Sequence, residues 1–157
     1  MSFVCMATSC RHSQTVPSNT SGIDNSEYVM ANRSLLVTGV GESRNHQQAI
    51  SKSRTSALDS AVTILRESVN TIAAERGFQP VSIEELQLTN TRVVDQHTTA
   101  YNNDNGIRIY RSTQTLCIDI ESSLKDIFDK LGTSADYGWY MFLHDIDRHL
   151  DPKNSKQ

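Results

Sequence analysis

Three stretches of the chain have the apolar, β-branched pattern of β-strands. The first covers residues 34–40 and ends at Gly41. The other two, residues 85–101 and 107–120, flank the sequence N-N-D-N-G, whose residues tolerate the positive φ angles of a hairpin turn. In the last stretch the apolar residues Leu116, Ile118 and Ile120 alternate with Thr115, Cys117 and Asp119, as in a half-buried strand. The pattern therefore predicts one strand followed later by a long hairpin.

Between the first strand and the hairpin the apolar period changes to three and four residues, which predicts a long helix over residues 47–76. Ser43 or Asn45 can cap its start, and Gly77 can end it. Its apolar stripe consists of Ala57, Leu58, Ala61, Val62, Leu65, Val69, Ile72 and Ala73. The small residues early in this stripe would let the helix approach a sheet closely. We expect Gly39 and Gly41 to serve that close packing or to form a bulge.

Two further helices are predicted after the hairpin. The first has Ser122 or Ser123 as its cap and Gly132 as its stop, and its stripe is Leu124, Ile127, Phe128 and Leu131. The second covers residues 135–150 and stops before Pro152, with a stripe of Trp139, Leu143, Ile146 and Leu150. The order of elements predicts an α+β fold: a small antiparallel or mixed sheet made of a strand and a long hairpin, a long helix, and two C-terminal helices.

Two regions are candidates for binding a partner. Near the hairpin turn no face of either arm is apolar, because polar residues occupy both faces: Arg92, Gln96, His97, Thr98, Arg108 and Arg111. We expect this tip to project, and projecting hairpins can pair edge to edge with a neighbouring subunit. In the last helix, Tyr137, Tyr140 and Phe142 lie near or beside the stripe and would form a partner patch if exposed or core if buried. The partner-binding hypothesis names Trp139, Tyr140, Phe142, Arg108 and Tyr110.

Length and charge narrow the possible classes of protein. A chain of 157 residues has room for one domain with tails, which we place at residues 31–150, with a disordered tail at 151–157. The net charge of -3 argues against a nucleic-acid binder, which needs a basic face. The sequence contains no run of about eighteen apolar residues that could form a transmembrane helix.

The first ten residues, M-S-F-V-C-M-A-T-S-C, resemble the end of a lipoprotein signal. The small residues Ala7, Thr8 and Ser9 precede Cys10, and a signal peptidase pocket accepts small side chains before a cysteine that is to be lipidated. A basic n-region is missing, so we expect the full signal to start upstream of Met1. The alternative is a disordered N-terminus in which the cysteine occurs by chance.

Residues 11–30 are rich in Ser, Thr, Asn and Gln, and we expect them to form a disordered polar tether. Such a tether would link a membrane anchor at Cys10 to the domain. Stable anchoring needs more than one acyl chain, and the multiple acylation of bacterial lipoproteins meets that need. The sequons at Asn19 and Asn32 are also compatible with a secreted eukaryotic protein.

The candidates for chemistry are few. Cys5, Cys10 and Cys117 have no metal-ligand spacing, and we interpret Cys117 as a small buried residue. A G-x-G at Gly39 and Gly41 lacks the third glycine of a dinucleotide loop, because Arg44 stands there. His144, Asp145, Asp147 and His149 cluster on the last helix, but a histidine spacing of five puts the rings on divergent faces, as on a solvated polar face. His97 has no neighbouring nucleophile. We expect no cofactor, no metal and no catalysis, and a hydrolase using His144 and Asp147 is the weakest alternative.

Residues 36–43 read L-V-T-G-V-G-E-S, and they are followed by the alanines Ala49, Ala57 and Ala61 and by a later strand at 114–120. Over residues 35–120 the chain resembles the Lpp-twenty family of bacterial outer-membrane lipoproteins, and the helix containing Trp139 lies outside the resemblance. The resemblance implies a non-enzymatic, periplasm-facing outer-membrane lipoprotein that self-associates or supports a secretion or motility complex, with protein partners and no nucleic acid. The alternative is a periplasmic module that binds a small ligand or a peptide along the sheet or the Trp139 helix.

Overall fold

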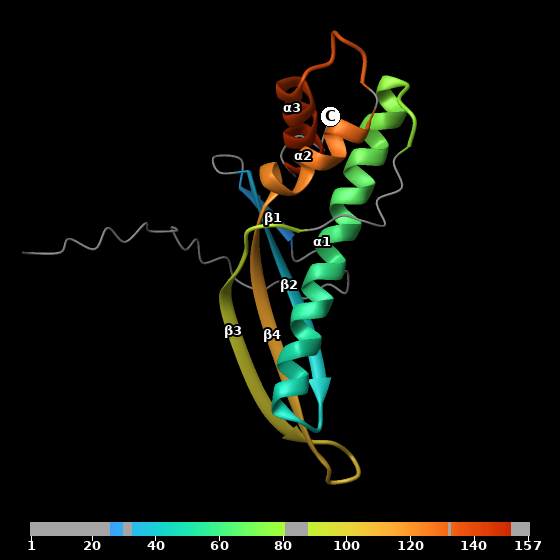
Figure 1. Cartoon of the computed structure of the whole chain (residues 1–157). Coiled ribbons are helices and arrows are strands. Elements are labelled where there is room, and N and C mark those ends of the chain that lie inside the picture. Colours follow the sequence, from blue (N-terminus) through green and yellow to red (C-terminus); the bar gives the residue numbers. More distant parts are fainter. Residues whose placement is uncertain (1–25, 30–32, 81–87, 132, 152–157) are drawn as a thin grey trace, which may run out of the picture.

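The protein is described by a computed structural model that covers residues 26–29, 33–80, 88–131 and 133–151 (Figure 1). The elements in chain order are β1 (Ser26–Val29), β2 (Ser34–Ser43), α1 (His46–Arg76), β3 (Thr91–Asn102), β4 (Arg108–Asp119), α2 (Ile120–Lys130) and α3 (Trp139–Leu150). All strands pair antiparallel, in the order β1-β2-β4-β3. The predicted α+β fold is confirmed, and its sheet is antiparallel.

The long helix α1 begins at His46, one residue before the predicted start, and ends at Arg76 as predicted. The side chain of Asn45 accepts a hydrogen bond of 3.1 Å from the backbone N–H of Gln48, so Asn45 is the cap. Gly77 ends the helix with a φ of 71°, the left-handed conformation that glycine adopts without steric cost.

The start of the domain differs from the prediction. Ser26–Val29 pairs with Ser34–Val37 as the short strand β1, so these residues belong to the sheet and not to the tether. Four residues are too few to show a hydrophobic period, which is why the pattern missed them. The expected lipidation site Cys10, the rest of the tether and the tail after residue 151 lie outside the described residues.

Several other boundaries also differ from the prediction, and β2 extends to Ser43 rather than ending at Gly41. α2 begins directly after β4, and its cap is Asp119, whose Oδ1 accepts from the Ser122 N–H at 3.1 Å. The expected caps Ser122 and Ser123 therefore lie inside the helix. α3 begins at Trp139, with Gly138 as its cap, rather than at residue 135. β3 begins at Thr91, since residues 88–90 are not strand. The expected stops Gly132 and Pro152 lie outside the described residues.

α1 lies along one face of the sheet, over β2 and β4, with β3 on the far side of β4 (Figure 1). Alternate residues of β2 and β4 face the helix and form the core with its apolar stripe: Leu35, Val37, Leu116, Ile118, Ala57, Ala61, Leu65, Val69 and Ile72. The helices α2 and α3 close the core at the C-terminal end of α1. At the opposite end lie the hairpin turn and the start of α1.

The two glycines of β2 allow α1 to approach the sheet closely. A Cβ added to Gly39 would lie 2.1 Å from the Ser53 carbonyl oxygen, and one added to Gly41 would lie 2.3 Å from the Ser53 backbone nitrogen. No side chain fits at these distances, because the nearest atoms belong to the helix backbone. The β2–β4 register is unbroken at these residues. The glycines therefore serve close packing and not a bulge.

This contact predicts that Gly39→Ser destabilises the fold. The added atoms would force α1 away from β2, and overpacking of this kind costs about 1–3 kcal/mol of unfolding free energy. Gly138→Ser is the matched control, because a Cβ there meets nothing within 4 Å and serine is a favourable helix cap. Urea unfolding of both variants would measure the difference. A Gly39→Ser protein as stable as the Gly138→Ser protein would contradict the proposed role of the glycine.

Candidate functional site

β3 is an edge strand whose outer side pairs with no strand among the described residues. All of its residues except Thr91 and Thr98 are exposed. The cause is the position of α1, which lies over β2 and β4, so that no described helix covers either face of β3 (Figure 1). The projecting, exposed hairpin that the sequence predicts is therefore present, and its exposure is greatest along this strand.

The hydrogen-bond alternation of the hairpin determines which backbone groups of β3 point outward. Asn103 N donates to the Ile107 carbonyl at 2.9 Å, so these two residues form a hydrogen-bonded pair next to the turn. Such pairs recur at every second residue of an antiparallel ladder. In the observed register, Tyr101, Thr99 and His97 therefore bond to β4. The residues between them turn their N–H and C=O groups to the open edge: Gln96, Thr98, Ala100 and Asn102.

This open edge is regular over most of its length. The register shifts between Val93 and Asp95, where a bulge interrupts the ladder, and it is continuous from Asp95 to Asn102. Natural proteins commonly protect edge strands with prolines, lysines or bulges. β3 contains no proline and no lysine, so the bulge at one end is the only one of these three devices in the strand. The continuous segment is a template for strand addition.

A small polar layer holds β3 against the rest of the sheet on the side of α1. The Gln114 amide donates to Gln96 Oε1 at 2.6 Å, and the Thr98 hydroxyl donates to the Ser112 hydroxyl at 3.2 Å. Ser53 of α1 also donates to the Ser112 hydroxyl, at 3.3 Å. Side-chain hydrogen bonds therefore replace an apolar core in this part of the sheet. They keep the edge strand in place and do not use its outward backbone groups.

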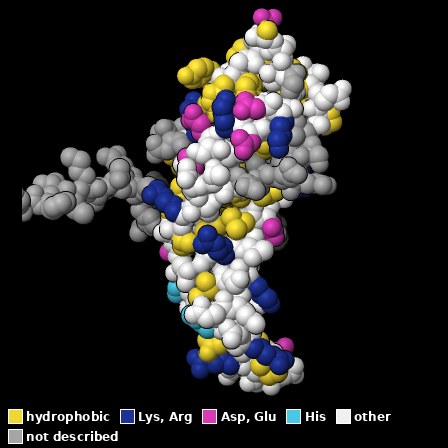
Figure 2. All heavy atoms as spheres, in the orientation of Figure 1, with side chains coloured by type: hydrophobic (Ala, Val, Ile, Leu, Met, Phe, Trp, Pro, Cys, Tyr) yellow, Lys and Arg dark blue, Asp and Glu magenta, His cyan; other side chains and the backbone are white. Residues whose placement is uncertain are grey.

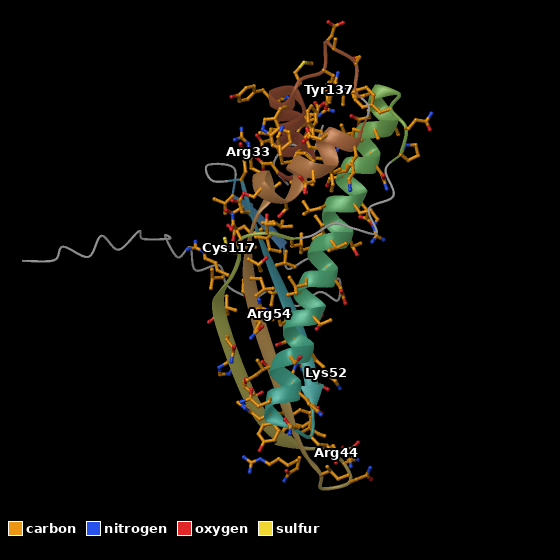
Figure 3. All side chains as sticks on the ribbon, in the orientation of Figure 1. Arg33, Arg44, Lys52, Arg54, Cys117 and Tyr137 are labelled. Carbon is orange, nitrogen blue, oxygen red and sulfur yellow. The ribbon has the colours of Figure 1, made fainter. Side chains whose placement is uncertain are left out.

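Arg108 and Tyr110 lie at the turn end of the hairpin, and both were predicted from the sequence to bind a partner. The structure brings these two together: the Arg108 guanidinium lies 5.5 Å above the Tyr110 ring. The His46 ring meets the same tyrosine edge-on, with ring centroids 5.5 Å apart. These contacts tie the hairpin to the first turn of α1. Figure 2 shows Lys and Arg side chains gathered at this end, and Figure 3 places Arg44 there.

On the other face of the same end, Glu42 of β2 connects two hairpin residues. Arg111 Nε lies 3.6 Å from Glu42 Oε1. Desolvation and the Glu42 carboxylate raise the pKa of the Tyr101 hydroxyl above its usual value. The hairpin is thus joined to β2 by side chains as well as by the ladder.

The aromatic residues of α3 separate into core and surface. Phe142 is fully buried and packs against Phe128 and Trp139, with centroids 5.3 and 5.7 Å away, so it is not accessible to a partner. Tyr137 is also buried, whereas Tyr140 is 83% exposed. The patch hypothesis is therefore wrong for Phe142 and stays a prediction for Tyr140.

Trp139 is half-buried at the rim of an open depression. The depression has a volume of about 480 Å³, and its other lining residues are Asp119, Glu121, Ser122 and Lys125. The Lys125 ammonium lies 4.8 Å above the Trp139 ring and covers one of its faces. A ligand could stack on that face only after displacing the lysine.

A buried carboxylate lies where the helical end of the domain meets α1. Asp145 is 2% exposed and accepts two hydrogen bonds of 3.0 Å from Arg76 and one of 2.7 Å from the Tyr137 hydroxyl. Figure 3 places Tyr137 at the helical end of the domain. Burial alone would raise the pKa of Asp145, but the bonds from Tyr137 and Arg76 and the arginine charge outweigh it and lower the pKa. Burial and the carboxylate raise the pKa of Tyr137.

This Asp145 cluster, consisting of Asp145, Arg76 and Tyr137, corrects the prediction of a solvated polar face. Asp145 lies three residues after the buried Phe142 and next to the buried Ile146, so it shares their face of the helix. That spacing was the one signal in the sequence. Its partners could not be found from the pattern, because one lies at the end of α1 and the other before α3.

The structure separates the remaining histidine candidates. His144 is 80% exposed and its Nδ1 lies 3.9 Å from Asp145 Oδ1, while Asp147 lies 3.5 Å from Arg33. His149 contacts Glu75 at 3.3 Å, and Arg148 contacts the same carboxylate at 2.6 Å. Among the residues that the structure covers, no group of three or more His, Cys, Asp or Glu could hold a metal ion. Cys117 is buried with a free thiol, as predicted.

Comparison with known proteins adds no assignment, since no family model, no curated protein and no solved structure matches the chain. None of the helices in the described part of the chain combines the length and the hydrophobicity of a transmembrane segment.

The Asp145 cluster predicts that Asp145→Asn strongly destabilises the domain. The variant puts a neutral amide in place of the buried carboxylate, so Arg76 and Tyr137 lose the charged acceptor of their hydrogen bonds. Because the folded pKa of Asp145 is lowered, its contribution is complete at neutral pH and is lost as the pH falls through the folded pKa. Acid should therefore weaken the variant less than the wild type.

Urea unfolding at neutral and acidic pH would measure both effects. Asp129→Asn is the control, because Asp129 forms an exposed pair with Lys125 at 3.5 Å, and exposed pairs contribute at most about 1 kcal/mol. Equal stability losses in the two variants would show that Asp145 is not a structural link.

Proposed function

We propose that this protein is a non-enzymatic assembly protein of the bacterial envelope. In this proposal a lipid on Cys10 holds the chain at the outer membrane, facing the periplasm. The domain binds protein through the outer edge of β3, either in a larger secretion or motility complex or in an oligomer. The observation that carries the proposal is the regular open edge of β3, which presents the outward backbone groups of Gln96, Thr98, Ala100 and Asn102.

The physical reason is the cost of leaving this edge unpaired. A long open strand pairs readily with other strands, and proteins that stay monomeric usually block such an edge. β3 is open along its regular segment and no described helix covers either of its faces, so a partner strand could add without displacing any described element. The polar layer at Gln96 and Thr98 holds β3 in its strand conformation before a partner binds, which reduces the entropy cost of binding.

The anchoring part of the proposal depends on the sequence alone. Small residues precede Cys10, a polar stretch follows it, and the segment 36–43 resembles outer-membrane lipoproteins. The second candidate function, a periplasmic module for a small ligand, is supported by the depression at Trp139. It is the weaker candidate because Lys125 already covers that ring.

Metabolic labelling with a palmitate analogue tests the anchor. We expect label on the wild-type protein expressed from its native gene and none on Cys10→Ala. Cys5→Ala is the matched control, since it removes a neighbouring cysteine and should keep the label. Label that survives in Cys10→Ala, or an unlabelled wild type with an intact Met1, would contradict anchoring at Cys10.

Proline at residue 100 tests the binding edge. The Ala100 N–H points away from β4, so Ala100→Pro removes a donor from the open edge and leaves the β3–β4 ladder intact. We expect the complex, sized by native electrophoresis and light scattering, to fall to the size of one chain, with the circular dichroism spectrum unchanged.

Ala100→Lys is a second variant for the same edge, because lysine discourages edge pairing without constraining the backbone. Thr99→Pro is the contrasting control, since the Thr99 N–H lies within the ladder and its loss should destabilise the fold itself. A complex that persists in both folded residue-100 variants would rule out this edge as the binding surface.

A further inference from the structure

We infer that β3 pairs with β3 of a second copy of this chain, in antiparallel register about a two-fold axis that passes between the two Thr99 residues. This inference rests on the proposed function and deepens it by naming the partner and the register. Two four-stranded sheets would join into one continuous sheet, with both α1 helices on the same face.

The register follows from the outward groups of the strand. Two strands form hydrogen bonds only where the outward residues of one strand lie opposite the outward residues of the other. The outward residues of the second copy must therefore lie opposite the same set in the first: Gln96, Thr98, Ala100 and Asn102. With Thr99 on the axis, Gln96 faces Asn102 and Thr98 faces Ala100, and both pairs occur twice. All four outward residues are then paired. An axis at Thr98 would instead place Asn102 against Val94, within the bulge.

The side chains in this register are complementary. His97 faces Tyr101 of the second copy, the two Thr99 side chains meet, and Gln96 faces the amide of Asn102. Aromatic and β-branched pairs directly across a ladder are stabilising. The segment from Asp95 to Asn102 has one formal charge, at Asp95, so no like charges face each other along the paired residues. A neutral, self-matching edge favours a second copy over a partner selected by charge.

The sheet also has a second open edge. β1 pairs only with Ser34–Val37, so the side of β2 away from β4 has no strand partner at residues 38–43 among the described residues. Pairing β3 of one copy with this part of β2 in another copy would be head-to-tail and would not close into a dimer. It would also keep the two Thr99 residues apart. The two arrangements are therefore distinguishable by a cross-link at residue 99.

A cysteine at the axis tests the inference directly. Thr99 would lie in a pair without hydrogen bonds, where opposing Cα atoms are about 4.5 Å apart, within the range of a disulfide. We would introduce Thr99→Cys into the full chain with Cys5→Ser, Cys10→Ser and Cys117→Ala, and oxidise it with oxidised glutathione. We expect most of the protein to run as a covalent dimer on a non-reducing gel.

His97→Cys in the same background is the matched control. It lies on the same strand and the same face and is also exposed, but the inferred register offsets it by four residues, or about 13 Å, from its copy. We expect at least tenfold less dimer than for Thr99→Cys. Mixing His97→Cys with Tyr101→Cys protein should restore the cross-link, because these residues face each other. Adding Ala100→Pro to Thr99→Cys should abolish it.

The possible outcomes separate the inference from the proposed function. Equal cross-linking at residues 97 and 99 would show random collision or another register and would overturn the inference. If Thr99→Cys formed no cross-link while Ala100→Pro still disrupted the complex, the inference would also be overturned. The proposed function would then stand, with a different partner at the same edge. If Thr99→Cys formed no cross-link and Ala100→Pro left the complex intact, the edge of β3 would be excluded both as the binding surface and as the dimer interface.

Discussion

The close contact between α1 and β2 determines much of the rest of the structure. Gly39 and Gly41 place the helix backbone against the strand at a distance where no side chain fits. The helix facing them carries small residues, Ala49, Ser53 and Ala57. Because this contact fixes α1 over β2 and its neighbour β4, the helix cannot also cover β3. The exposure of β3 is therefore a consequence of the packing and not of local mobility.

The two ends of the domain are held together by different forces. At the helical end, large apolar side chains and the Asp145 cluster join α1 to α3. At the hairpin end the contacts are hydroxyl and amide hydrogen bonds, an ion pair at Glu42 and the stacked Arg108 and Tyr110. Burial contributes most at the helical end. The hairpin end is ordered with little apolar burial, so it can present a strand edge in a fixed conformation.

Most of the fold could be predicted from the sequence because its main elements carry strong local signals. The apolar stripe of α1 predicts the helix and Gly77 predicts its end, while the N-N-D-N-G turn identifies the hairpin. β1 was missed because four residues show no period. The cap at Asp119 was missed because the residue reads equally well as the end of a strand.

The candidate site was less predictable. The exposure of the hairpin could be predicted from its polar pattern, but the direction in which the backbone groups of β3 point could not. Which β3 residues face outward depends on the register with β4 and on the bulge at Val93 and Asp95, and both are set by tertiary pairing. Asp145 shows the same limit, because its burial was implied by its spacing from Phe142 while its partners Arg76 and Tyr137 are remote in sequence.

The outward backbone groups of β3 should be free in the monomer and become paired on association. Amide hydrogen exchange followed by NMR over a concentration series measures this most directly. In dilute protein, Thr98 and Ala100 should exchange fast while Thr99 and Tyr101 are protected by β4. Raising the concentration should slow the amides of Thr98 and Ala100 and leave the other two unchanged. Exchange that does not alternate along β3, or that does not respond to concentration, would contradict the account.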